Sequence, residues 1–204
     1  MDNFDTDDLM ARTDFVEGSP LTRDALSFAA DRHAGQTRDL DGDVPFVTHP
    51  VEVACLLHEA GYSDEVVAAG VLHELLEDTD VQPEELRSRF GDRVTELVAS
   101  VSDDPSIEDD VAQKAALRRQ VEDAGESTAV IFAADKVSKS RELRQRLREG
   151  GFSEGDKAKL DHYHASLGML ERVLPGHQLL DRLRAELDAL ESSLREQRHT
   201  ELAG

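Results

Sequence analysis

The longest unbroken apolar run in this 204-residue chain, AVIFAA at residues 129–134, ends at a charged residue, Asp135. On periodicity alone the run could be a strand, because buried strands and buried helices look alike over so few residues. The segment continues as DKVSKSREL, which makes it long for a strand, and its alanine content favours a helix. We therefore predict a buried helix whose apolar part leads directly into a carboxylate.

The rest of the chain is dominated by helical signals. Val94, Leu97, Val98 and Val101 recur at i, i+3, i+4 and i+7, and no hairpin signal or internal repeat is present. The sequence therefore predicts an all-α helical bundle. The expected helices cover residues 22–35 with Thr22 as N-cap, 49–61, 63–78 with Ser63 as N-cap, 83–91, 94–101, 111–124, 128–143, 154–174 and 178–200.

The chain divides into three parts. Residues 1–18 are Asp-rich without periodicity, which predicts a flexible acidic N-terminal arm. Residues 19–175 form one helical domain. Residues 176–204 form a C-terminal amphipathic helix, in which leucines from Leu180 to Leu194 alternate steps of three and four. This seam is expected to pack on the domain, and a homodimer contact is the alternative.

The composition restricts the partners and the location. A net charge of −21 repels phosphate backbones, so no nucleic-acid partner is expected. Abundant Asp and Glu with only five Lys is typical of a high-salt or a high-GC background. The single cysteine, Cys55, stands in an apolar context and indicates a packed thiol in a reducing compartment. Since neither a membrane span nor a signal peptide is recognisable, we expect a cytoplasmic protein without a membrane partner.

The stretch VLHELLEDTD at residues 71–80 places ionisable groups between two apolar pairs. His73 and Glu77 are four residues apart, as are Glu74 and Asp78, so these groups lie on adjoining ridges of one helical sector. Burying several carboxylates beside a histidine is costly unless a cation lies among them. The spacing therefore fits either a divalent-metal site or an exposed polar helix face.

Two residues elsewhere favour the metal site. His49 stands at a helix start immediately before Pro50. Asp135 directly follows the apolar run of the buried helix, where a carboxylate requires a positive partner. Two histidines with carboxylates make a mixed nitrogen and oxygen ligand set. Such a set suits Mn²⁺, Fe²⁺, Co²⁺ or Zn²⁺ better than Ca²⁺.

The order H…HE…D resembles the HD phosphohydrolase superfamily, whose signature is H…HD…D on a helical bundle. The segments HAGQTR (33–38), VPFVTHPVEVA (44–54), VLHELLEDT (71–79), FG (90–91) and AADK (133–136) resemble the RelA/SpoT-type hydrolase domain. The likeness is greatest to its small stand-alone form, like the metazoan SpoT homolog. It covers residues 21–170 and implies that residues 19–175 are an HD hydrolase domain.

That family removes the 3′-pyrophosphate from guanosine tetra- and pentaphosphate with Mn²⁺, so the resemblance implies a metal-dependent (p)ppGpp pyrophosphohydrolase. It implies that Glu77 and Asp78 are catalytic, handling the attacking water and the proton transfers. The implied metal ligands are His49, His73, Glu74 and Asp135, and the implied substrate-binding residues are Arg38, Lys136, Lys139 and Tyr163. Residues 114–148 carry nine Lys or Arg against five Asp or Glu, a local excess that suits a polyphosphate.

The chain departs from the family pattern at three positions. Glu74 stands where the signature has Asp, Lys139 stands where the family has Asn, and Asp39 follows Arg38 where close relatives are often basic. Two alternatives follow from these departures. One is an HD-type phosphohydrolase of another nucleotide, and the other is a catalytically degenerate HD domain that acts as a nucleotide- or partner-binding module.

Overall fold

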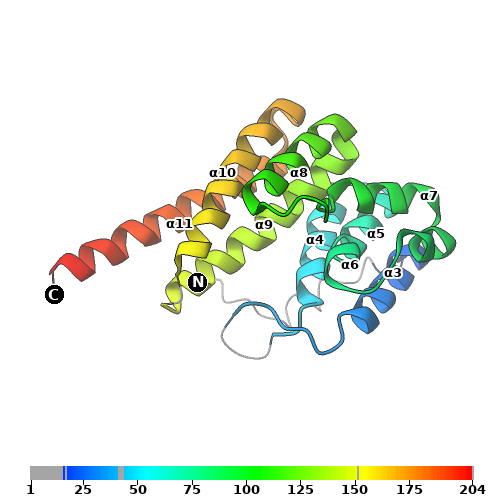
Figure 1. Ribbon diagram of the computed structural model, residues 1–204, viewed down its shortest axis with the longest axis horizontal. Coiled ribbons are helices and arrows are strands. Elements are labelled where there is room, and N and C mark those ends of the chain that lie inside the picture. The colour runs from blue at the N-terminus through cyan, green and yellow to red at the C-terminus, as the bar shows by residue number, and fades with distance from the viewer. Residues whose placement is uncertain (1–15, 17, 41–43, 151, 204) are drawn as a thin grey trace.

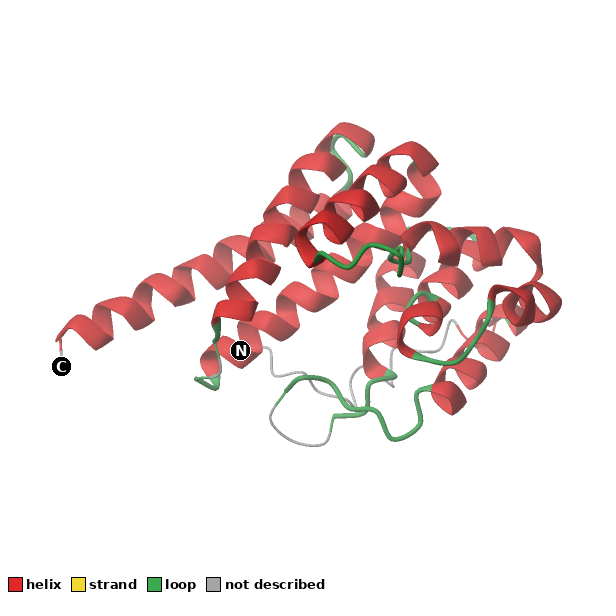
Figure 2. Ribbon diagram, viewed as in Figure 1, coloured by secondary structure: helices red, strands yellow, loops and turns green. Residues whose placement is uncertain are grey.

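The computed structural model describes residues 16, 18–40, 44–150 and 152–203 of the chain, with side chains described up to residue 197. These residues contain helices, one isolated bridge between Thr37 and Pro45, and no strand (Figure 2). The helices are α3 (Pro20–Arg32), α4 (Thr48–Glu59), α5 (Asp64–Leu72), α6 (Leu75–Asp78), α7 (Pro83–Val101), α8 (Asp110–Ala124), α9 (Glu126–Arg148), α10 (Glu154–Val173) and α11 (Gln178–Ala203). The all-α prediction is confirmed. Apart from residues 16 and 18, the predicted acidic arm lies outside the described residues, and the three-part division of the chain stays a prediction.

Helix α9 is the centre of the fold (Figure 1). It contacts α4, α5, α7, α8, α10 and α11, and residues 129–134 near its start are at most 2% exposed. Because neighbours cover this part of the helix on all sides, an unbroken apolar run is compatible with a helix here. The buried helix predicted for this segment is confirmed, and the strand alternative is wrong.

The helix predicted over residues 63–78 is interrupted. Helix α5 ends at Leu72 and α6 begins at Leu75, so the expectation of one continuous helix is wrong. Both intervening residues keep right-handed backbone angles, but ψ rises to −9° at Glu74 and tightens the turn. Adjacent side chains on a regular helix point about 100° apart. At this interruption His73 and Glu74 instead reach the same buried space.

Two helix boundaries illustrate how local chemistry sets the fold. Ser19, not Thr22, caps α3: the Ser19 side chain accepts a hydrogen bond from the Thr22 backbone N–H at 3.2 Å. The Thr22 prediction is wrong because Pro20 already occupies the first helical turn, where its missing N–H costs nothing. Gly91 lies inside α7 with a φ of +84°, so the predicted end of a helical segment at this glycine is confirmed.

Helix α11 packs along α9 and α10. Its leucines at positions 180, 183, 187 and 190 are at most 2% exposed, and Leu194 is half-buried. The predicted seam therefore lies against the chain's own core, and the homodimer contact stays a prediction. The C-terminal end of α11 extends beyond the other helices (Figure 1). Among the described helices, none combines the length and the apolar character that crossing a membrane requires.

Candidate metal centre and polyphosphate cavity

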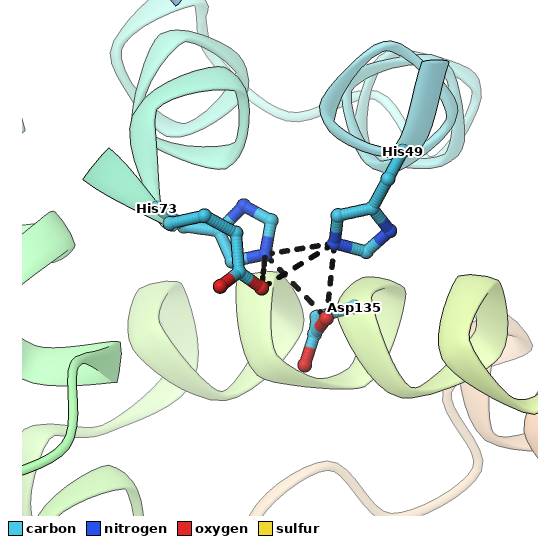
Figure 3. A group of neighbouring side chains, drawn as sticks. His49, His73 and Asp135 are labelled. Atoms are coloured by element: carbon cyan, nitrogen blue, oxygen red, sulfur yellow. Dashed lines mark hydrogen bonds and ion pairs between the residues drawn. The ribbon is translucent and has the colours of Figure 1, made fainter. Parts of the chain in front are cut away.

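Three separate parts of the fold bring four metal-ligand candidates together (Figure 3). His49 comes from the first turn of α4, Asp135 from the middle of α9, and His73 and Glu74 from the interruption between α5 and α6. All four residues are buried, and one donor atom of each lies within 4.8 Å of the others. We call these four residues the ligand cluster.

The donor atoms are spaced as ligands of one ion would be. The Nε2 atoms of His49 and His73 are 3.2 Å apart. Glu74 Oε1 lies 3.5 Å from the His49 nitrogen and 3.0 Å from the His73 nitrogen. Asp135 Oδ1 lies 3.3 Å and 3.4 Å from the same two nitrogens, respectively. Ligands about 2.1 Å from one ion are about 3.0–3.4 Å apart when they occupy neighbouring coordination positions.

The hydrogen bonds of both imidazoles turn their Nε2 atoms toward the cluster, where each offers a lone pair when its ring is neutral. His73 Nδ1 donates to the Gly70 carbonyl at 2.8 Å, so in the neutral ring Nε2 carries the lone pair. The Ser138 hydroxyl donates to Glu52 Oε2 at 2.5 Å and therefore accepts from His49 Nδ1 at 2.8 Å. The His49 Nε2 lone pair consequently also faces the cluster.

Charge and hydrogen bonding in the cluster fit a divalent cation. Within the described part of the chain, the buried Asp135 Oδ1 makes no hydrogen bond. Burial disfavours a charged His73, yet the carboxylates of Glu74 and Asp135 raise its pKa to about 10. The cluster therefore attracts positive charge at neutral pH, as a cation-binding site must.

Two lysines from α9 contact the carboxylates of the cluster. Lys139 Nζ lies 2.6 Å from Glu74 Oε1 and 3.3 Å from Asp135 Oδ1. Lys136 Nζ lies 2.5 Å from the other oxygen of Asp135, Oδ2, and 4.3 Å above the centre of the Phe132 ring. Both predicted substrate-binding lysines therefore stand immediately beside the predicted metal ligands.

A cavity of about 270 Å³ opens beside the cluster. His49 and Tyr163 line it, and its cationic lining residues are Lys114, Lys136, Lys139, Arg146 and Lys159. Four of the chain's five lysines therefore surround one space, although the protein as a whole is strongly acidic. This concentration of positive charge suits an anionic ligand.

Some lining residues were not singled out from the sequence. Lys114 and Arg146 belong to the basic segment 114–148, which the sequence identified only as a whole. Lys159 lies outside that segment, on α10. It stands four residues before Tyr163, a spacing that places both side chains on one helix face and could have revealed it.

Arg38 lies elsewhere, in a buried ionic network next to the cluster. Its Nε donates to Glu142 Oε2 at 2.7 Å, and its Nη1 lies 3.4 Å from Glu52 Oε2. Glu52 also accepts hydrogen bonds from Ser138 and from Arg141. We call Arg38, Glu52, Ser138 and Arg141 the glutamate network. Arg38 is fully buried there and is not among the cavity-lining residues, so its predicted contact with substrate stays a prediction.

Glu77 and Asp78, the predicted catalytic pair, lie on α6 outside the ligand cluster. Both residues are exposed overall, and Glu77 Oε1 accepts a hydrogen bond from the Asp103 backbone N–H at 2.9 Å. Partial desolvation, followed by the charge of Glu74, raises the pKa of both carboxyl groups. Carboxyl groups with raised pKa values next to a cation site are suited to proton transfer.

A protein-family model described as "HD domain" matches residues 25–148, a range that contains the whole ligand cluster. The chain belongs to the HD-domain family. The predicted HD-domain fold is thereby confirmed.

Curated relatives of this HD-domain protein include guanosine-3′,5′-bis(diphosphate) 3′-pyrophosphohydrolase MESH1 from mouse and from zebrafish. The mouse protein is 38% identical over 136 residues, which cover 64% of this chain and 73% of the relative. The zebrafish protein is 36% identical over 132 residues, which cover 62% of this chain and 71% of the relative. The predicted relationship to the stand-alone metazoan SpoT homolog is confirmed.

Solved structures agree on the fold. A structure of a metazoan ortholog of SpoT, described as hydrolysing ppGpp, matches with a TM-score of 0.72 and covers 83% of this chain and 95% of its own. Its sequence identity is 24%, so this likeness concerns the fold alone. A crystal structure of a Listeria monocytogenes protein matches with a TM-score of 0.62 and 27% identity, and covers 68% of this chain and 96% of its own.

Proposed function

We propose that this protein is a divalent-metal-dependent pyrophosphohydrolase that removes the 3′-pyrophosphate from guanosine 3′,5′-bis(diphosphate), with Mn²⁺ as the metal. One observation carries the proposal: a buried, electron-rich set of four donors opens beside a cavity lined by most of the chain's lysines. The curated names of the MESH1 relatives support the same activity and the same substrate.

The proposed metal ligands are His49, His73, Glu74 and Asp135. Two imidazole nitrogens and two carboxylate oxygens suit Mn²⁺, and they also suit Zn²⁺, Co²⁺ or Fe²⁺. When bound, such an ion would lower the pKa of water from about 15.7 toward about 7, the value reached at zinc, and would polarise phosphoryl oxygens.

The lysines around the cavity supply the charge that a bis(diphosphate) requires. We assign Lys136, Lys139 and Tyr163 to substrate binding because all three line the cavity. Burial raises the pKa of the Tyr163 hydroxyl above its ordinary value. This group therefore stays protonated and can donate a hydrogen bond to a phosphate oxygen. Arg38 is proposed to act on the same substrate from the glutamate network.

Glu77 and Asp78 are proposed to move the protons. Attack of a water oxygen on the phosphorus next to the ribose breaks the bond to the 3′-oxygen. The water loses one proton and the departing 3′-oxygen gains one. Two carboxyl groups with raised pKa values, one accepting and one donating, can carry out both transfers.

A second candidate is hydrolysis of another nucleotide by the same centre. Lys139 favours it, because an ammonium group lies where the family has an amide that orients the nucleotide. An additional cation at this position suits a ligand with a different arrangement of phosphates. A degenerate, purely binding domain is the third candidate, and it predicts nucleotide binding without turnover.

The deciding experiment is incubation of the purified protein with guanosine 3′,5′-bis(diphosphate) and Mn²⁺, followed by measurement of released pyrophosphate. We expect metal-dependent release that stops on chelation. Parallel reactions with Zn²⁺ and Co²⁺ and with a panel of other nucleotides separate the candidates. Turnover of a panel nucleotide but not of the bis(diphosphate) would favour the second candidate. Binding without release under every metal would favour the third.

Three predictions about partners and location belong to this proposal. The charge of −21 argues against a nucleic-acid partner, and the single cysteine argues for the cytoplasm. The homodimer alternative is tested by measuring the molar mass in solution.

A further inference from the structure

Lys139 occupies a position that conflicts with a metal ion in the ligand cluster. Its ammonium nitrogen contacts Glu74 Oε1 at 2.6 Å and Asp135 Oδ1 at 3.3 Å. These oxygens are the ones that face the imidazole nitrogens of His49 and His73. The lysine therefore neutralises the same two atoms that a divalent ion would need as ligands.

A divalent ion and an ammonium group cannot share these oxygens without strong repulsion. Coulomb energy rises as distance falls, and it is screened least where groups are buried. Both carboxylates lie almost entirely away from solvent. Metal binding must therefore displace the ammonium group of Lys139 or proceed at reduced affinity.

Lys139 has somewhere to move, whereas Lys136 does not. The Lys139 side chain is 34% exposed and lines the lysine-rich cavity. The Lys136 side chain is only 6% exposed and is held over the Phe132 ring. A lysine has a flexible four-carbon stem, so the Lys139 ammonium can turn from the carboxylates into the cavity.

We propose that Lys139 is a displaceable counter-cation that competes with the divalent ion for Glu74 and Asp135 and, once displaced, binds the anionic ligand in the cavity. The inference rests on the proposed metal centre. Linkage then requires metal and anion to strengthen each other's binding, because each favours the displaced position of the same ammonium group. Lys139 thus lowers metal affinity alone and restores it when a phosphorylated ligand is present.

The first test measures Mn²⁺ affinity by isothermal titration calorimetry without any nucleotide. Lys139→Met keeps most of the length of the side chain and removes its charge, and we expect it to bind Mn²⁺ at least 10-fold more tightly than the native protein. Lys157→Met, an exposed lysine on α10 outside the cavity lining, is the matched control and should match the native affinity. Circular dichroism shows whether each variant is folded.

The second test measures the coupling, with sulfate as the anion because it binds Mn²⁺ only weakly. Sulfate replaces chloride at constant ionic strength. We expect several-fold tighter Mn²⁺ binding in the native protein and in Lys157→Met, and no such change in Lys139→Met.

The outcomes distinguish this inference from the function on which it rests. Equal Mn²⁺ affinity in Lys139→Met and the native protein would overturn the competition and leave the metal centre standing. An equal sulfate effect in both proteins would overturn the coupling. If none of the three proteins binds Mn²⁺, the proposed metal centre fails and this inference fails with it.

Discussion

Two buried polar clusters lie side by side between α4 and α9, and they differ in how completely the protein satisfies them. In the glutamate network, Glu52 receives hydrogen bonds from Ser138 at 2.5 Å and from Arg141 at 2.8 Å, and an ion pair from Arg38. Burial opposes ionisation, but these partners lower the pKa of Glu52. The negative charge of Glu52 is therefore compensated by groups of the protein itself.

The ligand cluster is left open by comparison. Both imidazole Nε2 atoms converge on carboxylate oxygens. Within the described residues Asp135 Oδ1 makes no hydrogen bond, and its contact with the part-exposed Lys139 is a 3.3 Å ion pair. His49 belongs to both environments, because its Nδ1 bonds Ser138 while its Nε2 faces the cluster. The glutamate network is thus completed by buried groups of the protein itself, whereas the carboxylates of the ligand cluster are paired with a part-exposed lysine that an external cation can replace.

The largest expected effect comes from removing a donor of the open cluster. We expect Asp135→Asn to abolish Mn²⁺ retention and pyrophosphate release, a loss beyond the roughly 100-fold that follows from changing the hydrogen-bond partners of ligands. Elemental analysis after metal loading checks the first and a release assay the second. Asp161→Asn, on the surface of α10, is the control. Equal metal content in Asp135→Asn and the native protein would remove Asp135 from the centre.

Breaking the glutamate network should lower the stability of the fold rather than the affinity for metal. Arg38→Met leaves Glu52 with less compensation in a buried place, and we expect a loss of about 3–5 kcal/mol in the free energy of unfolding. Urea denaturation measures it. Arg93→Met, at an exposed position of α7, should stay within about 0.5 kcal/mol of the native protein. An unchanged stability would contradict the role of Arg38 in the glutamate network, and a raised KM in the same variant would support its proposed action on the substrate.

Glu77 belongs to neither cluster, so its removal should separate chemistry from binding. We expect Glu77→Gln to retain the metal and the native stability while kcat falls about 100-fold, the lower range for losing a general acid or base. Steady-state kinetics with parallel metal analysis provide the measurement, and Glu96→Gln on α7 is the exposed control. Native turnover in the Glu77 variant would exclude this residue from the mechanism.

The smallest effect is expected from removing the hydrogen bond between His49 and Ser138, which joins the two clusters. Ser138→Ala removes the acceptor that orients His49, and we expect about 10-fold weaker Mn²⁺ binding. Ser140→Ala is a closely matched control, because Ser140 is equally buried on α9 and its hydroxyl makes no hydrogen bond among the described residues. Calorimetric titration compares both variants, and identical losses of affinity in the two would contradict a specific role for Ser138.

The sequence alone determined the all-α fold class and the ligand candidates. Apolar spacing gave the helical bundle, and the run at residues 129–134 identified the helix that became its centre. The resemblance to the HD superfamily supplied the complete set of His49, His73, Glu74 and Asp135, which the structure brings together. These features were predictable because helical periodicity and short motifs are recorded in neighbouring residues.

Only the tertiary structure decided the surroundings of these residues. The interruption at His73 and Glu74, the burial of Arg38, and the contact of Lys139 with Glu74 join parts of the chain that the sequence leaves unrelated. Lys139 and Glu74 are 65 residues apart along the chain, yet their Nζ and Oε1 atoms are 2.6 Å apart. Spacing along one helix is fixed by local backbone geometry, but contacts between helices depend on how all of them pack.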